Sequence, residues 1–478
     1  MNTIHSSVLS FAPSSVATVR RPGLVFPKVG LASSIIGTAA AAWSVPPDCG
    51  LAGALAVPAL VLSLGLILAP ILAALRDLRS LVRAENVLAS APVYWLLLDL
   101  MQGSYGISMS TREAVVFAFI ACGLFSVSVW SAALQRAWRL PSLVERLSRH
   151  DLSSSKIVTL VIVCFVLGIF YFLFMAAFDP HTVVASLLAN RSGAAWSRNS
   201  AEGGWDAFVE HLSYFGMLLP ALAISLGRKR GWFSPPALFA WVLALFYALF
   251  QVQGGNRRYL GVMLGAAIVV WLIAEDRPRW YHTVVLAISA ATVLYLMQFV
   301  LEYRFGGAEM ITQAEEDVTL VDMSAIKVDD NFLRLAQTIY LVPNTEPYTW
   351  YEYALFALIR PIPRALWEGK PIAPSFRVQD FVEVGASLSS SVVGELYASG
   401  GLLAVFLGGW LYGRLGVWGE GLLGPPRTVP RNILYGAWLM ALFAGCRSMQ
   451  DLVMMSYVVL ALLAVLWFIL ENSGLRTT

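Results

Sequence analysis

Runs of about 20 mostly apolar residues recur along the chain, and they constrain its fold more than any other feature. A helix that crosses a bilayer needs about 20 apolar residues, and it is favoured there because its backbone polar groups bond within the segment. Twelve runs fit, near residues 29–45, 52–75, 87–103, 113–134, 157–178, 207–226, 235–252, 259–274, 282–303, 392–412, 432–446 and 452–470. The first is rich in Ala and Ser, the third contains Asp99 and the eleventh is short, so these three are the weakest. We expect an all-α, polytopic integral membrane protein with about twelve transmembrane helices.

The composition agrees with a membrane protein and excludes several other classes. Hydrophobic residues make up 58% of the 478 residues and charged residues only 13%, about half the roughly 25% of a soluble domain. The net charge of +3 is small and scattered, so we expect no nucleic-acid partner. Three of the four cysteines lie within apolar runs and the fourth stands alone, which excludes a disulfide framework. The sequence shows no metal-ligand spacing and no glycine-rich nucleotide loop, so we expect no metal and no cofactor.

Lys and Arg are concentrated in alternate connections between the apolar runs, and this sets the expected orientation. If the N-terminus is cytoplasmic, the cytoplasmic segments collect 20 of the 33 Lys and Arg residues, against six in the short outer segments. Cytoplasmic loops carry such an excess, so both termini are expected inside. The expected units are a cytoplasmic tail (1–28), nine helices (29–304), an outer loop (305–391), three helices (392–470) and a second tail (471–478).

The outer loop is 87 residues long, far beyond the usual connection of about 4–6 residues. It begins with the acidic residues Glu309, Glu315, Glu316, Asp317, Asp322, Asp329 and Asp330. A short amphipathic helix with Phe332, Leu335 and Ile339 on one side is expected next. An aromatic stretch (348–353) and a proline-rich stretch (360–371) follow. A loop of this length either binds a ligand or is disordered, and the aromatic residues and prolines favour an ordered, functional loop.

Arg257 and Arg258 form the first candidate anion site. They follow Gly254–Gly255 in a short turn on the outer side, against the positive-inside bias, and charges near hydrocarbon are costly to hold. The Gly-Gly turn could also offer backbone N–H groups to an anion. The alternative is that both arginines reach to the membrane surface with no ligand.

Arg360, Arg364 and Lys370 form the second candidate site, in the outer loop. Pro361 and Pro363 prevent a continuous helix, so a stiff turn is expected to hold the two guanidinium groups in place. Arginine matches phosphate oxygens with a planar fork, and lysine adds a point charge. The alternative is a solvated loop that the prolines merely stiffen.

Arg447 and Glu395 complete the set of charged candidates. Arg447 lies in a very short outer turn, where Asp451 is close enough in sequence to pair with it. Glu395 lies at the outer entry of the tenth span, where an ionisable group needs a partner or a function. It is either a general base or the partner of one of the arginines. Together these turns would bring four or five cations to one outer surface, which suits a lipid diphosphate, with an ordinary anionic headgroup as the alternative.

The motifs that carry these charges resemble those of the oligosaccharide repeat-unit polymerases of the O-antigen polymerase type. The likeness covers about residues 85–470, with many spans and one large outer loop. The matching motifs are Gly255–Arg258, Ile362–Arg364 with Trp367 and Lys370–Pro371, Gly394–Tyr397 with Gly400–Gly401, and the Arg447 turn.

The resemblance implies a glycosyltransferase that uses no nucleotide sugar. It would pass a glycan on undecaprenyl diphosphate to the hydroxyl of an incoming lipid-linked repeat unit at the outer face of the plasma membrane, and so build a surface polysaccharide. A flippase and a chain-length regulator are the protein partners that it implies. Arg257, Arg258, Arg360 and Arg364 would bind the diphosphate, with Lys370 and Arg447 in support. Glu395 would act with Arg360 and Arg364 in catalysis, as base or orienting residue. The aromatic residues that could bind sugar are Trp350, Tyr353, Trp367 and Tyr397.

Three other functions compete with this one. An O-antigen ligase has a similar layout, but its loop carries an important histidine, and residues 305–391 contain none. A dolichyl-phosphate-sugar type glycosyltransferase usually has an acidic pair in its first outer loop, where this chain has only Asp48. A transporter or flippase is compatible with twelve spans, but the sequence shows no internal repeat and no interrupted spans in matching positions.

Overall fold

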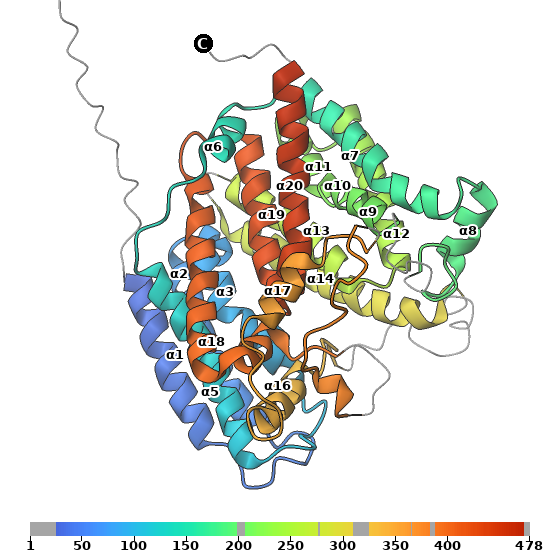
Figure 1. The fold of residues 1–478 in the computed structure, drawn as a ribbon. Helices are drawn as coiled ribbons and strands as arrows, with labels where there is room; N and C mark the ends of the chain where they lie inside the picture. The colour runs from blue at the N-terminus through green and yellow to red at the C-terminus, as the bar shows by residue number, and fades with distance from the viewer. Residues whose placement is uncertain are drawn as a thin grey trace, which may run out of the picture.

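The computed structural model describes residues 25–197, 206–275, 278–308, 325–364, 366–382 and 388–472. Arg20 and Arg21 of the N-terminal tail and the first five acidic residues of the long loop lie outside these ranges. Every element in the described ranges is helical (Figure 1). The elements are α1 (Val25–Trp43), α2 (Ala56–Arg76), η1 (Leu78–Val82), α3 (Ala84–Pro92), η2 (Val93–Leu97), α4 (Leu98–Met101), α5 (Arg112–Ala133), α6 (Ser142–Arg149), α7 (Ser154–Met175), α8 (Pro180–Leu188), α9 (Asp206–Val209), η4 (Glu210–Leu212), α10 (Ser213–Gly216), α11 (Leu219–Arg230), α12 (Pro235–Gln253), α13 (Arg257–Ile273), α14 (Trp280–Gly306), α16 (Asn331–Leu341), α17 (Glu352–Ile359), η5 (Val378–Asp380), α18 (Ser391–Gly419), η6 (Glu420–Leu423), α19 (Val429–Gly445) and α20 (Met449–Asn472).

Eight helices in the described ranges are long and apolar enough to cross a membrane: α1, α2, α5, α7, α12, α14, α18 (with η6) and α20. The other four predicted spans are also helical, but each differs from one long helix. Residues 84–101 are interrupted by the π-helical turn η2, and residues 206–230 form four short pieces. The helices α13 and α19 have only 17 residues each. The chain is therefore a multi-pass, all-helical membrane protein with eight clear candidate spans.

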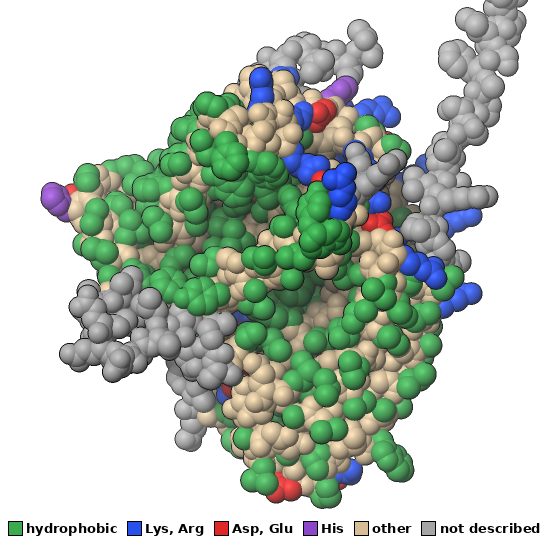
Figure 2. All heavy atoms as spheres, turned by 180° about the vertical axis from the view of Figure 1, so that it is seen from behind, with side chains coloured by type: hydrophobic (Ala, Val, Ile, Leu, Met, Phe, Trp, Pro, Cys, Tyr) green, Lys and Arg blue, Asp and Glu red, His purple; other side chains and the backbone are tan. Residues whose placement is uncertain are grey.

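The surface of the bundle agrees with a lipid environment. Figure 2 shows a face that is mostly hydrophobic, with most of its Lys and Arg side chains toward one end. Large apolar side chains lie exposed on the candidate spans, among them Leu64, Leu245 and Leu403. Such a surface is unfavourable in water and favourable against acyl chains.

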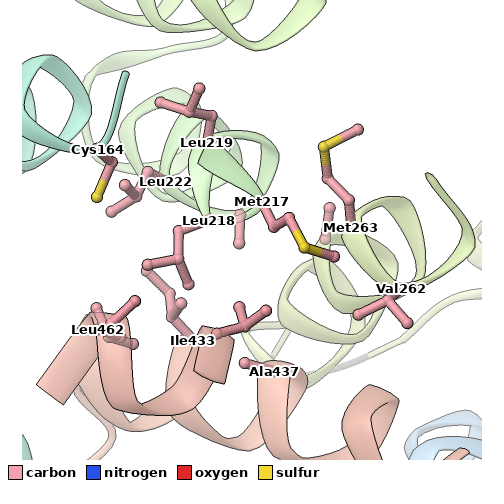
Figure 3. Packing of buried hydrophobic residues seen from close by; sticks show 14 of the residues in the cluster. Cys164, Met217, Leu218, Leu219, Leu222, Val262, Met263, Ile433, Ala437 and Leu462 are labelled. Carbon is pink, nitrogen blue, oxygen red and sulfur yellow. The ribbon is translucent and has the colours of Figure 1, made fainter. Parts of the chain in front are cut away.

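Two large buried clusters hold the helices together. One joins α7, α10, α11, α13, α19 and α20. Figure 3 shows part of it, with Leu218 from the turn between α10 and α11, Met263 of α13 and Ile433 of α19. The other joins α1, α2, α3, α5, α16 and α18. Small residues allow close contact within the second cluster: a Cβ added to Gly37 would lie 2.8 Å from the Cα of Gly65, so α1 and α2 touch through their backbones.

The helix ends gather at two rims. At one rim the Asp151 side chain accepts hydrogen bonds from Lys229 in the last turn of α11 and from the Val429 N–H at the start of α19. Arg83 pairs there with Glu420 of η6. We call this the opposite rim. At the other rim, which we call the long-loop rim, Asp329 in the segment before α16 pairs with Arg257 of α13 and with Arg447 in the turn between α19 and α20. Since α13 and α19 run from one rim to the other, the two rims lie at opposite ends of the bundle.

The described part of the long loop folds onto the helix bundle and contains the predicted amphipathic helix. α16 covers the expected amphipathic helix, and Phe332, Leu335 and Ile339 are all buried. A small cluster of Val342, Phe376, Val378 and Ala398 ties the loop to α18. α17 contacts α20, and Figure 1 shows α17 at the end of α20 that faces the loop. The loop thus forms a folded cover over the ends of α18, α19 and α20.

Candidate functional site

A buried carboxylate, Asp451, joins two of the predicted arginines at the long-loop rim. Its Oδ1 accepts a hydrogen bond from Nη1 of Arg258 at 2.6 Å, and its Oδ2 accepts one from Nη1 of Arg447 at 3.2 Å. The Asp451 side chain is only 2% exposed. The predicted pairing of Arg447 with Asp451 is therefore confirmed, and the same carboxylate also fixes Arg258, which the sequence places almost 200 residues earlier.

The segment before α16 is tied to the bundle through Asp329. Its carboxylate pairs with Nε of Arg447 at 2.9 Å and with Nη2 of Arg257 at 3.4 Å. Arg257 also donates to the carbonyls of Lys327 and Val328. Asp99, the carboxylate in the third predicted span, accepts hydrogen bonds from the N–H groups of Val328 and Asp329. Arg257 and Asp99 therefore hold the loop in place.

The turn between α12 and α13 differs from the expected anion site. The N–H of Gly254 donates to the Phe250 carbonyl, and that of Gly255 donates to the Val252 carbonyl. Both N–H groups thus close the last turn of α12, which extends to Gln253, and are used within the protein. The expected contribution of this Gly-Gly turn to anion binding is wrong, although the neighbouring Arg258 is correctly placed.

A break in α18 sets the position of Glu395. The backbone leaves helical geometry at Gly400 and Gly401, and Gly401 has φ +66°, a conformation that favours glycine. The break frees the Ala398 carbonyl, which accepts hydrogen bonds from the N–H and Oγ1 of Thr349 in the long loop at 2.9 and 3.3 Å. Glu395 therefore lies on a short half-helix that the loop itself caps.

One oxygen of Glu395 is held in place. Its Oε2 accepts a hydrogen bond from the N–H of Met449, the first residue of α20, at 2.7 Å. Within the described residues, the other oxygen has no hydrogen bond and the carboxylate makes no ion pair. The predicted ion pair between Glu395 and an arginine is therefore not formed among the described residues, and the role of general base stays a prediction.

The loop after α17 supplies the remaining cations. α17 ends at Ile359 and Arg360 follows, so no continuous helix runs through Pro361 and Pro363, as expected. Nζ of Lys370 donates to the carbonyls of Arg360 and Ile362, so this lysine closes the turn. Burial, together with the neighbouring charges of Arg360 and Arg364, lowers the pKa of Lys370 below its ordinary value. The three predicted cations of this turn therefore lie close enough to influence one another.

A cavity of about 280 Å³ collects many of these groups, and we call it the arginine cavity. Its volume is near the lower end of small-molecule sites, which measure about 300–1,000 Å³. Four basic and two acidic side chains line it, so its lining is net positive: Arg258, Arg360, Arg377, Arg447, Glu395 and Asp451. The ring of Tyr353 lies in the wall, and its hydroxyl donates to the Phe376 carbonyl at 2.8 Å. Burial, and then the nearby carboxylates of Glu395 and Glu352, raise the pKa of Tyr353.

Five of the eleven predicted residues line the arginine cavity: Arg258, Tyr353, Arg360, Glu395 and Arg447. The other six do not. Arg257 binds the loop segment, and Lys370 closes the turn that also carries Arg364. Trp350 and Trp367 are exposed at the surface, and Tyr397 is buried in the second large cluster.

Two of the six charged residues that line the cavity were not predicted as site residues. Arg377 forms a two-point ion pair with Asp380 in the long loop, three residues on. Asp451 was expected only as a partner of Arg447. The Arg–x–x–Asp spacing and the position of Asp451 at the start of the last span were the available signals.

Comparisons with models of protein families, with curated proteins and with solved structures find no match to this chain. The fold defines the class of the protein, a multi-pass all-helical membrane protein. The arginine cavity defines its candidate site, a cationic pocket with a half-buried carboxylate at one rim of the bundle.

Proposed function

We infer that this protein is a glycosyltransferase that polymerises lipid diphosphate-linked oligosaccharide repeat units. The observation that supports this function best is the arrangement of Arg258, Arg360 and Arg447 around one cavity with Glu395 in its wall. Fixed guanidinium groups stabilise the negative charge that develops on a departing diphosphate. A carboxylate beside them can orient the attacking hydroxyl or accept its proton.

The reaction that we propose makes one bond and breaks one. The hydroxyl oxygen of the incoming repeat unit attacks the anomeric carbon of the growing glycan. The bond from that carbon to the diphosphate oxygen breaks, and the diphosphate keeps the electron pair. The proton of the hydroxyl passes to Glu395, and Arg258, Arg360 and Arg447 neutralise the leaving group. The growing chain thereby moves to the incoming lipid carrier, undecaprenyl diphosphate in a bacterial membrane.

The proposal places the arginine cavity at the outer face of the plasma membrane, with twelve crossings and both termini in the cytoplasm. The four segments beyond the eight clear spans would complete the twelve. α13 and α19, at about 1.5 Å per residue, are each roughly 25 Å long and can cross a core of about 30 Å with their flanking residues. Most of the Lys and Arg residues that the structure describes lie toward the opposite rim, which suits the cytoplasmic side.

A flippase is the main competitor, because a cationic cavity also suits transport of a lipid diphosphate. The position of the arginine cavity favours the enzyme. It lies at the ends of α18, α19 and α20 under a folded loop, whereas transporter sites lie near the middle of the bilayer.

Purified protein separates the two functions directly. A lipid diphosphate-linked repeat unit is added in detergent without nucleotide sugar, and the products are resolved by gel over time. We expect a ladder of multiples. Glu395→Gln keeps an oxygen that can accept the Met449 N–H bond, so it should fold normally but slow the ladder by about 10²–10⁴-fold, the usual contribution of a general base.

Two other results would count against this function. No ladder with authentic substrate, together with protein-dependent movement of the lipid across liposomes, would establish a flippase. Transfer of the glycan to a different lipid acceptor, with no multiples formed, would indicate a ligase.

A further inference from the structure

A second cavity, of about 440 Å³, lies at the opposite rim. Its lining includes the last residues of three helices, Arg76 of α2, Ala133 of α5 and Ile273 of α13. It also includes residues from the beginning of two others, Val25 of α1 and Asn432 of α19. α13 and α19 connect this place with the arginine cavity, so the two cavities lie at opposite ends of the same helices. We call it the opposite-rim cavity.

Its lining is basic. Arg76, Arg79, Arg83 and Arg427 face two acidic residues, Asp77 and Glu85. Two of the arginines are held in place: Arg79 makes paired hydrogen bonds to Asp77, and Arg83 pairs with Glu85 at 2.8 Å and with Glu420 at 3.0 Å. The guanidinium of Arg76 lies over the ring of Phe26, 4.9 Å from its centre. Arg76 makes no ion pair with any described residue, so its charge is available to a ligand.

Two buried polar atoms in the wall also point to a ligand. Asn86 is only 3% exposed, and its Nδ2 donates to the Ser80 carbonyl. Its Oδ1 has no hydrogen-bond partner among the described residues, and neither has the hydroxyl of Ser80. Buried polar atoms are nearly always paired. Here an acceptor and a hydroxyl donor are left over in a cavity that carries net positive charge.

Apart from Asn432, the rest of the wall is apolar: Val25, Phe26, Pro27, Ala73, Ala133, Ile273 and Leu423. Because these residues belong to the ends of helices that cross the membrane or to their flanks, the cavity lies at the depth of lipid headgroups. A ligand that fits both the basic, polar part of the lining and its apolar part is an amphiphile with an anionic, hydroxyl-bearing head and an apolar tail.

We propose that the opposite-rim cavity binds an anionic phospholipid whose headgroup carries a free hydroxyl. Arg76 and Arg427 contact the phosphate, the Ser80 hydroxyl donates to a phosphate oxygen, and the headgroup hydroxyl donates to Oδ1 of Asn86. This site does not depend on the reaction proposed for the arginine cavity.

The test is equilibrium binding to the full-length chain in an uncharged detergent, measured by native mass spectrometry. The probes are phosphatidylglycerol, phosphatidylcholine and glycerol 3-phosphate, which has the headgroup chemistry without the tails. We expect one tightly bound phosphatidylglycerol. The double variant Arg76→Gln/Arg427→Gln should weaken its binding by at least about tenfold, since one charge-assisted hydrogen bond is typically worth that factor.

Two further variants separate a built site from general attraction. Arg136→Gln/Arg139→Gln removes the same charge from exposed positions outside the cavity and should leave binding unchanged. Ser80→Ala removes a hydroxyl without a described protein partner, so it should weaken binding by about threefold with no change in thermal unfolding.

The proposal is wrong if phosphatidylcholine binds as tightly as phosphatidylglycerol, or if the control pair weakens binding as much as the cavity pair. If glycerol 3-phosphate competes at the same concentration as the lipid, the ligand is a free phosphate ester and the assignment to a lipid is overturned. Retained binding in Arg76→Gln/Arg427→Gln and in Ser80→Ala would also overturn it.

Discussion

Asp451→Asn should destabilise the protein strongly, because this carboxylate holds two arginines together. It is buried, with Arg258 at 2.6 Å and Arg447 at 3.2 Å. Removing one member of a buried ion pair costs about 3–5 kcal/mol. Arg447 keeps Asp329 as a second partner at 2.9 Å, whereas Asp451 is the only carboxylate paired with Arg258 among the described residues. We therefore expect the lower end, a loss of about 3 kcal/mol in the free energy of unfolding.

Thermal unfolding in detergent measures this loss. All four cysteines are free and buried, so a thiol-reactive fluorophore reports when the bundle opens. For a chain of this size, a loss of about 3 kcal/mol corresponds to a fall in Tm of roughly 3 °C. Asp380→Asn is the matched control, because it breaks an exposed ion pair with Arg377, and such pairs contribute only about 0–1 kcal/mol.

Added anion supplies the decisive comparison. In Asp451→Asn, pyrophosphate can replace the lost negative charge between Arg258 and Arg447, so it should raise the Tm of this variant more than that of the wild type. Equal Tm values for Asp451→Asn and Asp380→Asn, or no larger effect of pyrophosphate on the former, would refute a desolvated arginine pair at this site.

Three further changes test the supports of the site. Gly401→Ala places a side chain at φ +66°, 3.0 Å from the Tyr348 hydroxyl. It should lower the free energy of unfolding by about 1–3 kcal/mol and slow glycan transfer by displacing Glu395. An unchanged Tm and an unchanged transfer rate would contradict the idea that the break in α18 positions Glu395. Asp99→Asn removes one acceptor for the Val328 and Asp329 N–H groups. It should lower the free energy of unfolding by about 1–3 kcal/mol and speed proteolysis of the segment before α16. If the variant resists proteolysis as well as the wild type, Asp99 does not hold this segment. Burial alone would raise the pKa of Asp151, but hydrogen bonds from Lys229 and from the Val429 N–H hold it below its ordinary value. The stability it contributes is therefore present above pH ~3.9 and is lost as the pH falls through the lowered pKa, so Asp151→Asn should lower Tm at pH 7 and match the wild type in strong acid; a difference that persists there would contradict this assignment.

The sequence predicts local features of this protein well. Apolar runs mark helical segments because a helix satisfies its own backbone in lipid. The positions of Phe332, Leu335 and Ile339 predict α16, and Pro361 and Pro363 predict that no continuous helix runs through this turn. Arg447 and Asp451 are four residues apart, so their pairing is also visible in the sequence.

The sequence does not predict contacts between distant segments. Asp99 and Asp329 meet across more than 200 residues, and nothing in their local context indicates it. The same limit explains the misplaced candidates. Tyr397 lies two residues beyond Glu395, where the turn of the helix directs it into the apolar cluster. Trp350 and Trp367 are exposed and do not line the cavity, which only the folded loop defines. The pair Gly400–Gly401 was visible as a motif, but its role in ending the half-helix of Glu395 depends on Thr349 in the loop.

If the arginine cavity is the site of glycan transfer, substitutions of two nearby arginines, Arg360 and Arg364, should differ in their effect on the transfer rate. Arg360 lines the cavity, and Arg364 lies in the same turn but outside the cavity lining. We expect Arg360→Gln to slow formation of the product ladder by about tenfold or more, because one charge-assisted contact is lost. We expect Arg364→Gln to have a clearly smaller effect. Equal rates in Arg360→Gln and the wild type, or a greater loss in Arg364→Gln, would contradict the assignment of glycan transfer to the arginine cavity.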